Sequence, residues 1–312
     1  MVYESKPNYG AIMVSGSNNP NDTNYSIVNV GSGVTLEGWS GIFVSHNNNS
    51  GYGIVVNIDG GINSVTDANG VTGSGVYVNG NIQNSSNYPI INLSDTARIS
   101  SSGTGIYAAG FAKYNIDGAY ISGSESGLGI KSGIFNITDG IIHGSGEDKT
   151  PTSGNNNGIN PSGAAVQIES NNGYKGNIEL NISGGTFESE QSNVIYEYVV
   201  NNTSTKVNYI SITGGTFVSN ADKPVFRLSD SFKNTHQRFI TGGKYSSNPS
   251  EYLKTGYTTS LENDMYEVVT ITISVFALKN ENSNNFLITF SIVLVLGIGA
   301  YLNRNKILNF FK

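Results

Sequence analysis

Short runs of apolar residues alternate with glycine, asparagine and serine along most of the chain, and this pattern predicts β-strands. The runs are three to eight residues long, and no segment between residues 10 and 245 has helical length or periodicity. The clearest runs are GIFVS (41–45), GIVVNI (53–58), GVYVNG (75–80), GIYAAG (105–110), AAVQIES (164–170), GNIELNI (176–182) and NVIYEYVV (193–200). We therefore expect an all-β protein.

One six-residue phrase recurs at a nearly constant interval. It reads ISGGTF at 182–187, ITGGTF at 212–217 and ITGGKY at 240–245, so the intervals are 30 and 28 residues. A period of this size is typical of a solenoid, in which each unit covers the apolar face of its neighbour. A propeller blade needs about 40 residues. Turns of about 20 to 30 residues with short strands favour a right-handed parallel β-helix, predicted for residues 1–245.

The repeated phrase is interpreted as one corner of this helix. Gly184 and Gly185 supply the backbone angles that the corner requires, and Thr186 lies outside. The side chains before and after the two glycines are predicted to point inward, and they are Ile182, Phe187, Ile212 and Phe217.

The composition narrows the possible functions. The chain has 312 residues, of which 39 are glycine, 13% are charged and none is cysteine. A hydrophobic content of 37% is enough for a core, so general disorder is excluded. A net charge of −6 argues against nucleic acid as a partner. Without cysteine there is no disulfide framework, zinc–thiolate site or cysteine nucleophile.

Two stretches carry a resemblance to a known family. The segments GLGIKSGIFNITDG (127–140) and GYKGNIELNISGGTF (173–187) resemble repetitive cell-surface proteins of Gram-positive bacteria that carry pectin-lyase-like adhesive β-helices. The segment GGKYSSNPSEYLKTGY (242–257) looks like the part that closes such arrays. The resemblance covers roughly residues 30–270 and implies a fold and a cell-surface location. It implies no ligand and no catalytic residue.

Residues 246–278 are expected to form a closing cap. Asn248 suits the N-cap of a short helix over 249–254, with Pro249 at its first position and Glu251 as in a capping box. Gly256 suits the end of that helix. The alternating run 265–275 then predicts one last strand, and a cap of this kind protects a sheet edge.

The C-terminus predicts a membrane anchor. Residues 286–302 contain no charge and are followed by Arg304 and Lys306. As a helix from Phe286 to Leu302 they would span about 26 Å of lipid. The basic tail, 303–312, is then cytoplasmic, and the β-helix is extracellular beyond a linker at 279–285. A buried C-terminal helix is the alternative interpretation.

Two targeting signals are missing from the sequence as given. The segment before the apolar run, ALKNENSNN, has no Leu-Pro-x-Thr-Gly-like pentapeptide for a sortase, so we expect retention in the membrane. The N-terminal segment MVYESKPNYGAIMVSG has no secretory pattern. We therefore expect either a longer protein of which this is the C-terminal part, or a wrongly assigned start.

An enzyme on this fold would need two or three carboxylates and a base on one face of adjacent turns. The candidates are Asp59, Asp67, Asp117, Asp139, Glu147, Asp148, His143 and Lys131. Asp117 and Asp139 each precede a glycine, which favours a turn role. Asp67 and Asn69 have the spacing of a calcium loop, but the glutamate that such a loop needs is missing. His46 and His236 have no companion ligands, so we expect no metal site and no cofactor.

Aromatic residues are the remaining candidates for ligand binding. Five lie near glycine-rich corners, where exposed rings would stack on sugars, and they are Trp39, Tyr52, Tyr77, Tyr107 and Tyr120. The alternative is that they pack against one another or fill the core. The sequence favours a non-enzymatic, membrane-anchored surface protein, adhesin-like or a structural stalk, that displays a β-helix to glycans or host surface proteins. The alternative is a surface polysaccharide lyase or glycoside hydrolase on the same fold.

Overall fold

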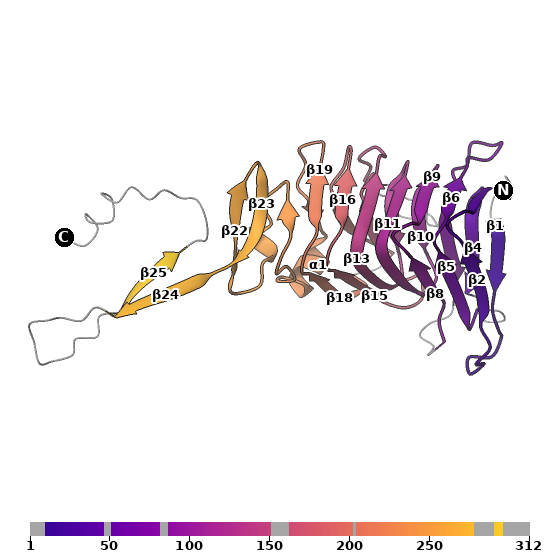
Figure 1. The fold of residues 1–312 in the computed structure, drawn as a ribbon, viewed down its shortest axis with the longest axis horizontal. Coiled ribbons are helices and arrows are strands. Elements are labelled where there is room, and N and C mark those ends of the chain that lie inside the picture. Colours follow the sequence, from indigo (N-terminus) through magenta and orange to yellow (C-terminus); the bar gives the residue numbers. More distant parts are fainter. Residues whose placement is uncertain are drawn as a thin grey trace, which may run out of the picture.

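The computed structural model of the chain is mostly β and describes residues 10–46, 51–81, 87–150, 162–201, 204–277 and 290–295. Strands from successive turns of the chain lie side by side along the long axis of the molecule (Figure 1). Most of these strands belong to two long sheets and pair in parallel. The predicted all-β class and the parallel pairing are confirmed, and the arrangement is compatible with a parallel β-helix.

The smaller of the two long sheets contains one strand from each turn of the chain, and all its pairs are parallel. In spatial order these are β1 (Gly10–Ser15), β4 (Ser40–His46), β7 (Val76–Gly80), β10 (Thr104–Ala108), β12 (Ser126–Ile130), β14 (Val166–Asn171), β17 (Ile195–Val200) and β20 (Phe226–Arg227).

The larger sheet has two parallel tracts that are joined because β11 and β13 run through both. The first tract is β2 (Ser26–Val30), β5 (Ile54–Ile58), β8 (Ile90–Leu93), β11 (Lys113–Gly123), β13 (Gly133–Gly144), β15 (Ile178–Ile182) and β18 (Val207–Ile212). The second adds β3 (Thr35–Gly38), β6 (Gly61–Ser64), β9 (Arg98–Ser101), β16 (Thr186–Ser189), β19 (Thr216–Ser219) and β21 (Lys244–Tyr245).

The core consists of like side chains stacked in register between neighbouring turns. One such ladder runs through the second tract as Leu36, Ile62, Ile99, Ile121, Ile142, Phe187, Phe217 and Tyr245. The rings of Phe187 and Phe217, and of Phe217 and Tyr245, stack with centroids 4.8 Å apart. This distance equals the usual spacing of about 4.8 Å between paired strands, so the rings follow the backbone.

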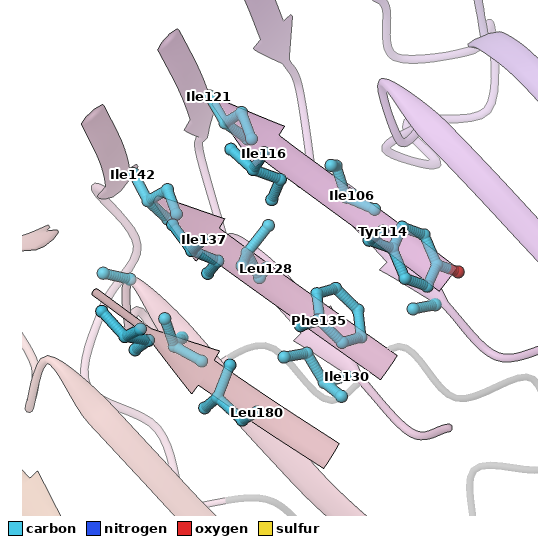
Figure 2. Packing of buried hydrophobic residues seen from close by; sticks show 14 of the residues in the cluster. Ile106, Tyr114, Ile116, Ile121, Leu128, Ile130, Phe135, Ile137, Ile142 and Leu180 are labelled. Carbon is cyan, nitrogen blue, oxygen red and sulfur yellow. The ribbon is translucent and has the colours of Figure 1, made fainter. Parts of the chain in front are cut away.

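Figure 2 shows the same principle in the middle of the core, where Tyr114 lies beside Phe135 and the isoleucines of adjacent strands line up. The rings of Tyr114 and Phe135 are 4.2 Å apart and nearly parallel, at 9°. The four side chains predicted to point inward, Ile182, Phe187, Ile212 and Phe217, are all buried, which confirms that part of the corner interpretation.

The two glycines of the repeated phrase meet different structural constraints, and each constraint excludes a side chain. Gly185 has φ of +91°, where a side chain is strained. Gly184 has no such angle, but a Cβ there would lie 2.1 Å from the carbonyl oxygen of Thr138 in the preceding turn. The prediction that the corner angle falls on both glycines is therefore half right. Thr186 is half-buried on the outer side of β16.

The end of the solenoid differs from its predicted form. A helix that the sequence did not predict, α1 (Asp230–Thr235), is capped by Ser229 and buries Phe232. It has only six residues, too few for a helical period to be visible. The helix expected over 249–254 is a shorter 3₁₀ helix, η1 (Ser250–Tyr252). The strand expected over 265–275 is broken at Ile271.

Two antiparallel hairpins follow. In the first, β22 (Tyr257–Glu262) pairs with β23 (Met265–Thr270), and β23 also pairs antiparallel with β21. Asn263 and Asp264 form its turn, both with positive φ, as in the tight turns that suit the twist of hairpins. The second hairpin pairs β24 (Thr272–Ala277) with β25 (Phe290–Val295).

Six residues of the segment expected to be a transmembrane helix are described, and they form strand β25. The run Phe-Ser-Ile-Val-Leu-Val is rich in β-branched and aromatic residues, and an apolar run of this kind suits a strand as well as a helix. No helix within the described parts of the chain is long and apolar enough to cross a membrane. The linker 279–285, the rest of 286–302 and the tail 303–312 lie outside the described residues.

The corner geometry leads to a stability prediction. Replacing Gly185 by Val should lower the free energy of unfolding by about 2 kcal/mol or more, because a β-branched residue is strained at this φ. The matched change Thr186→Val should cost less than about 1 kcal/mol, since its side chain is on the outer face. Thermal and denaturant unfolding of both variants measures the difference, and equal losses would contradict the corner assignment.

Candidate functional site

The outer face of the smaller sheet gathers three of the five predicted aromatic residues. Tyr77 stacks on Phe43 at 5.1 Å and on Tyr107 at 4.7 Å, because these residues are in register on β4, β7 and β10. Trp39 adds a tilted ring 6.0 Å from Tyr77. Trp39, Tyr77 and Tyr107 keep only 3%, 6% and 2% of their surface exposed, so they pack against one another instead of presenting rings to solvent.

The other two aromatic candidates are not brought into this cluster. Tyr52 is half-buried and forms an isolated antiparallel bridge with Ser17. Tyr120 is half-buried on β11, in the larger sheet, in register with Arg98 and Ile141. The five predicted residues therefore do not make one stacking surface.

A buried polar network continues the outer face of the smaller sheet beyond Tyr107. Lys131 Nζ is paired with Glu169 Oε2 by a short contact, and each side chain is only 1% exposed. The hydroxyl of Tyr198 donates to the same oxygen at 2.9 Å, and the amide of Asn171 donates to Oε1 at 2.7 Å. Gln167 donates to the Tyr198 oxygen at 2.7 Å. Each carboxylate oxygen of Glu169 therefore has a donor.

The strand period places these residues together. In β14 the apolar residues Val166 and Ile168 point into the core, so Gln167, Glu169 and Asn171 point outward. Register then sets Glu169 beside Tyr198 of β17. Ser162 covers this site, because its backbone and hydroxyl groups donate to Gln167 Oε1 at 2.9 and 3.0 Å.

Two aromatic rings cover the lysine. Lys131 Nζ lies 5.5 Å from the ring centroid of Tyr107 and 5.1 Å from that of Tyr174, which is cation–π geometry. Burial lowers the pKa of Lys131, and the charge of Glu169 opposes that change. Burial raises the pKa of Tyr107 and Tyr198 well above the usual range and that of Tyr174 to about 12. The phenols therefore remain protonated donors.

This network contains an acidic and a basic side chain of the kind used in acid–base catalysis, but solvent and substrate do not reach them in this structure. A carboxylate and an amine are in contact on one face of adjacent strands, which is part of the arrangement that the enzyme alternative required; the second carboxylate is not part of this network. However, the acceptors of Glu169 are occupied by Lys131, Tyr198 and Asn171, and the pair is buried. Because each carboxylate oxygen already accepts a hydrogen bond and both charged side chains are only 1% exposed, the network links β14, β17 and the residue that follows β12.

Three of the six predicted acidic candidates lie at turns or bends of the chain. Asp67 accepts hydrogen bonds from the backbone nitrogens of Asn69 and Val71, at 2.9 and 2.7 Å. Asp139 accepts from Gly140 N at 2.8 Å. Asp117 accepts from Thr138 of the neighbouring strand at 2.6 Å, and the register of β11 and β13 is irregular at Asp117 and Asp139, where each acid precedes a glycine with positive φ. These features agree with the turn interpretation of Asp67 and with a bend at Asp117 and Asp139.

The remaining charged candidates lie apart from the network. Glu147 pairs with Lys149 at the surface, and Asp148 pairs with Lys223 and Arg227. Asp59 is an exposed residue after β5. Glu147 and Asp148 have their own partners and Asp59 faces solvent, so these three acids are not part of the Lys131–Glu169 network.

The histidines are separated along the fold. His143 lies between the hydroxyl of Ser122, 3.3 Å from Nδ1, and Glu190, 3.2 Å from Nε2. His46 ends β4, and His236 bonds to Thr235 after α1. Within the described residues, no three histidine or acidic side chains gather where they would hold a metal ion.

A second regular feature follows the outer face of the larger sheet. Six asparagines at the same register position form a ladder of five hydrogen bonds of 2.8 to 3.1 Å, in which each side-chain amide nitrogen donates to the side-chain oxygen of the preceding asparagine. The six are Asn29, which only accepts, Asn57, Asn92, Asn115, Asn136 and Asn181. Each amide inside this ladder uses one of its two N–H groups and one lone pair. The remaining donors and acceptors face outward in a row.

Sequence reasoning missed Glu169, Tyr198 and Gln167, although it singled out Lys131. The alternation in AAVQIES was a signal for their outward direction, but not for their burial. The predicted anchor residues Phe286, Leu302, Arg304 and Lys306 lie outside the described residues. No protein-family model matches the sequence, and no match was found among curated proteins or solved structures.

The buried ion pair leads to a second stability prediction. Lys131→Met leaves the Glu169 carboxylate buried without its cation and should cost about 3 to 5 kcal/mol of unfolding free energy. Adding Glu169→Gln removes the unpaired charge and should recover a large part of that loss. Chemical unfolding of the single and double variants tests the coupling.

The matched control is Lys149→Met, which breaks a pair whose side chains are 60% and 71% exposed. It should cost less than about 1 kcal/mol. A Lys131→Met variant as stable as this control, or a double variant no better than the single one, would show that the buried pair is not coupled.

Proposed function

We propose that this protein is a non-enzymatic cell-surface protein, adhesin-like or a structural stalk, whose right-handed, pectin-lyase-like parallel β-helix displays its outer face to glycans or host surface proteins. The observation that carries this proposal is the state of the Lys131–Glu169 pair. It is the carboxylate–amine contact that chemistry on a sheet face would use, and it is buried, with a hydrogen-bond donor on each carboxylate oxygen.

The outer surface supports a display role. The asparagine ladder presents amide groups at intervals close to the strand spacing of about 4.8 Å. Amide donors and acceptors of this kind suit the hydroxyl groups of a saccharide. The stacked core holds the surface rigid, so little conformational entropy of the protein is lost when a ligand binds.

The resemblance to Gram-positive surface proteins supports a membrane location. In this proposal residues 286–302 cross the lipid, Arg304 and Lys306 remain in the cytoplasm, and the β-helix is outside. In this proposal β25 separates from β24 and becomes part of the membrane helix. The reason is that an open strand edge in lipid leaves backbone N–H and C=O groups without hydrogen bonds, whereas a helix makes all of these bonds within itself.

The second candidate is a surface polysaccharide lyase or glycoside hydrolase. The contact between Lys131 and Glu169 favours it, provided that the covering residues open to admit a substrate. The same experiment separates the two candidates.

A glycan array and a cell-binding screen of the full chain, with a lyase absorbance assay and a reducing-sugar assay beside them, test this proposal. We expect binding of at least one glycan or cell type and no turnover. Turnover of a polysaccharide that is lost in Glu169→Gln would favour the enzyme. Absence of binding to every glycan and cell surface would leave the structural stalk and contradict the adhesin.

Attachment has its own prediction. With an export signal supplied upstream, the full chain should fractionate with the membrane, because it has no sortase pentapeptide near Leu278. Truncation after Asn285 should release the protein into the medium. Intact chain bound covalently to peptidoglycan, or retention of the truncated form, would contradict the anchor.

A further inference from the structure

A small pocket lies where two successive turns of the chain pass the same corner. Residues of the corner between β14 and β15, together with residues 204–206 before β18, line an open pocket with a volume of about 330 Å³. Its lining includes Tyr174, Lys175, Gly176, Asn177, Thr205 and Lys206. This volume is at the lower end of the range for ligand pockets, about 300 to 1,000 Å³, and suits one monosaccharide unit.

The ammonium group of Lys206 donates two hydrogen bonds to backbone carbonyl groups and keeps a third N–H group for a ligand. Its Nζ donates to the carbonyl oxygen of Tyr174 at 2.6 Å and to that of Lys131 at 3.4 Å. An ammonium group has three hydrogens, so one remains for a ligand in the pocket that Lys206 lines. The backbone nitrogen of Lys206 donates to Ser170 at 2.8 Å, which fixes the start of the side chain.

The pocket is positively charged. Its lining contains Lys175 and Lys206 and no acidic residue. The nearby carboxylate of Glu169 interacts electrostatically with Lys206, but it is already paired with Lys131. The pKa of Lys206 is lowered to about 8, chiefly by burial and also by the charge of Lys175, while the charge of Glu169 opposes this change. An anion in the pocket would relieve the repulsion between the two lysines.

The backbone of the first corner is shaped for this pocket. Gly176 has φ of +85°, and a Cβ there would lie 2.4 Å from the ring of Phe111. The hydroxyl of Ser132 holds the corner through a short hydrogen bond to the carbonyl oxygen of Lys175. Tyr174 is half-buried and lines the pocket, and its carbonyl oxygen accepts the hydrogen bond from Lys206 Nζ, so this residue fixes the position of the ammonium group.

We propose that this pocket binds an acidic sugar unit, with the carboxylate or sulfate group on Lys206 and Lys175 and the sugar hydroxyl groups on the neutral polar residues of the lining, such as Asn177 and Thr205. This inference rests on the proposed function, since it names the class of glycan that the surface would bind. Cations beside neutral polar groups suit a ligand that has both a negative charge and hydroxyl groups.

Isothermal titration of the full chain with glucuronate, glucose 6-sulfate, glucose and inorganic sulfate tests the assignment. We expect both acidic sugars to bind at least about tenfold more tightly than glucose or sulfate. Lys206→Gln should weaken them by at least about tenfold, and Lys175→Gln by less, because Lys175 is exposed. The matched control Lys254→Gln removes the same charge at an exposed site in the cap and should change nothing.

The pH dependence follows from the pKa of Lys206. Binding needs the ammonium form, which is present below about pH 8 and is lost as pH rises through that value. The acidic sugars should therefore bind at about pH 6.5 and weaken at about pH 9.5 in the wild type, with a smaller change in Lys206→Gln.

The outcomes separate this inference from the proposed function. Equal binding of glucose and glucuronate, or binding unchanged by Lys206→Gln, overturns the acidic-sugar site and leaves glycan display intact. Inorganic sulfate as tight as glucose 6-sulfate overturns the role of the sugar hydroxyl groups. No binding of any probe, together with a positive glycan array, overturns the pocket alone.

Discussion

The constant register between successive turns of the chain is the constraint on which the rest of the structure depends. Parallel pairing in register places each inward side chain on its counterpart in the next turn, so isoleucine stacks on isoleucine and Phe187 on Phe217. A slip of one residue would exchange the inner and outer faces of a strand. The hydrophobic core therefore exists only while every turn keeps the register of its neighbour.

The same register creates the outer ladders. Side chains along each strand alternate between the core and the outer face, so strands whose inward residues are in register also have their outward residues in register. Each position on the outer face therefore forms a row of stacked side chains, and the chemistry of a row depends on which residue type occupies it. Asparagine on the larger sheet gives an amide ladder, and aromatic residues on the smaller sheet give a stack that covers Lys131. Where segments fold over the outer face, polar groups lose water and must find partners, which explains the complete hydrogen bonding of Glu169.

The number of residues per turn varies at the corners, because the strands in the sheets must keep a fixed register. Between equivalent positions the chain uses 22 residues from Ile106 to Leu128 and 38 from Leu128 to Val166, although both pairs are neighbours in the sheet. The corner residues are therefore free to differ. The lysine pocket, the cover of Ser162 and the cap with α1 all lie in connections between strands, where a solenoid has room for functional variation.

The sequence by itself determined the strands, their parallel stacking and the inward direction of Ile182 and Phe187, because alternation and a repeated phrase are local signals. It also identified Lys131 and three of the clustered aromatic residues. Only the tertiary structure decided that those rings are buried, since burial depends on segments that cover them from elsewhere in the chain. The contact between Lys131 and Glu169, 38 residues apart, depends on the length of one connection, and no local pattern encodes it. Residues 290–295 pair with β24 as a strand in the structure, and the sequence alone did not show this, because a short apolar run suits both a helix and a strand.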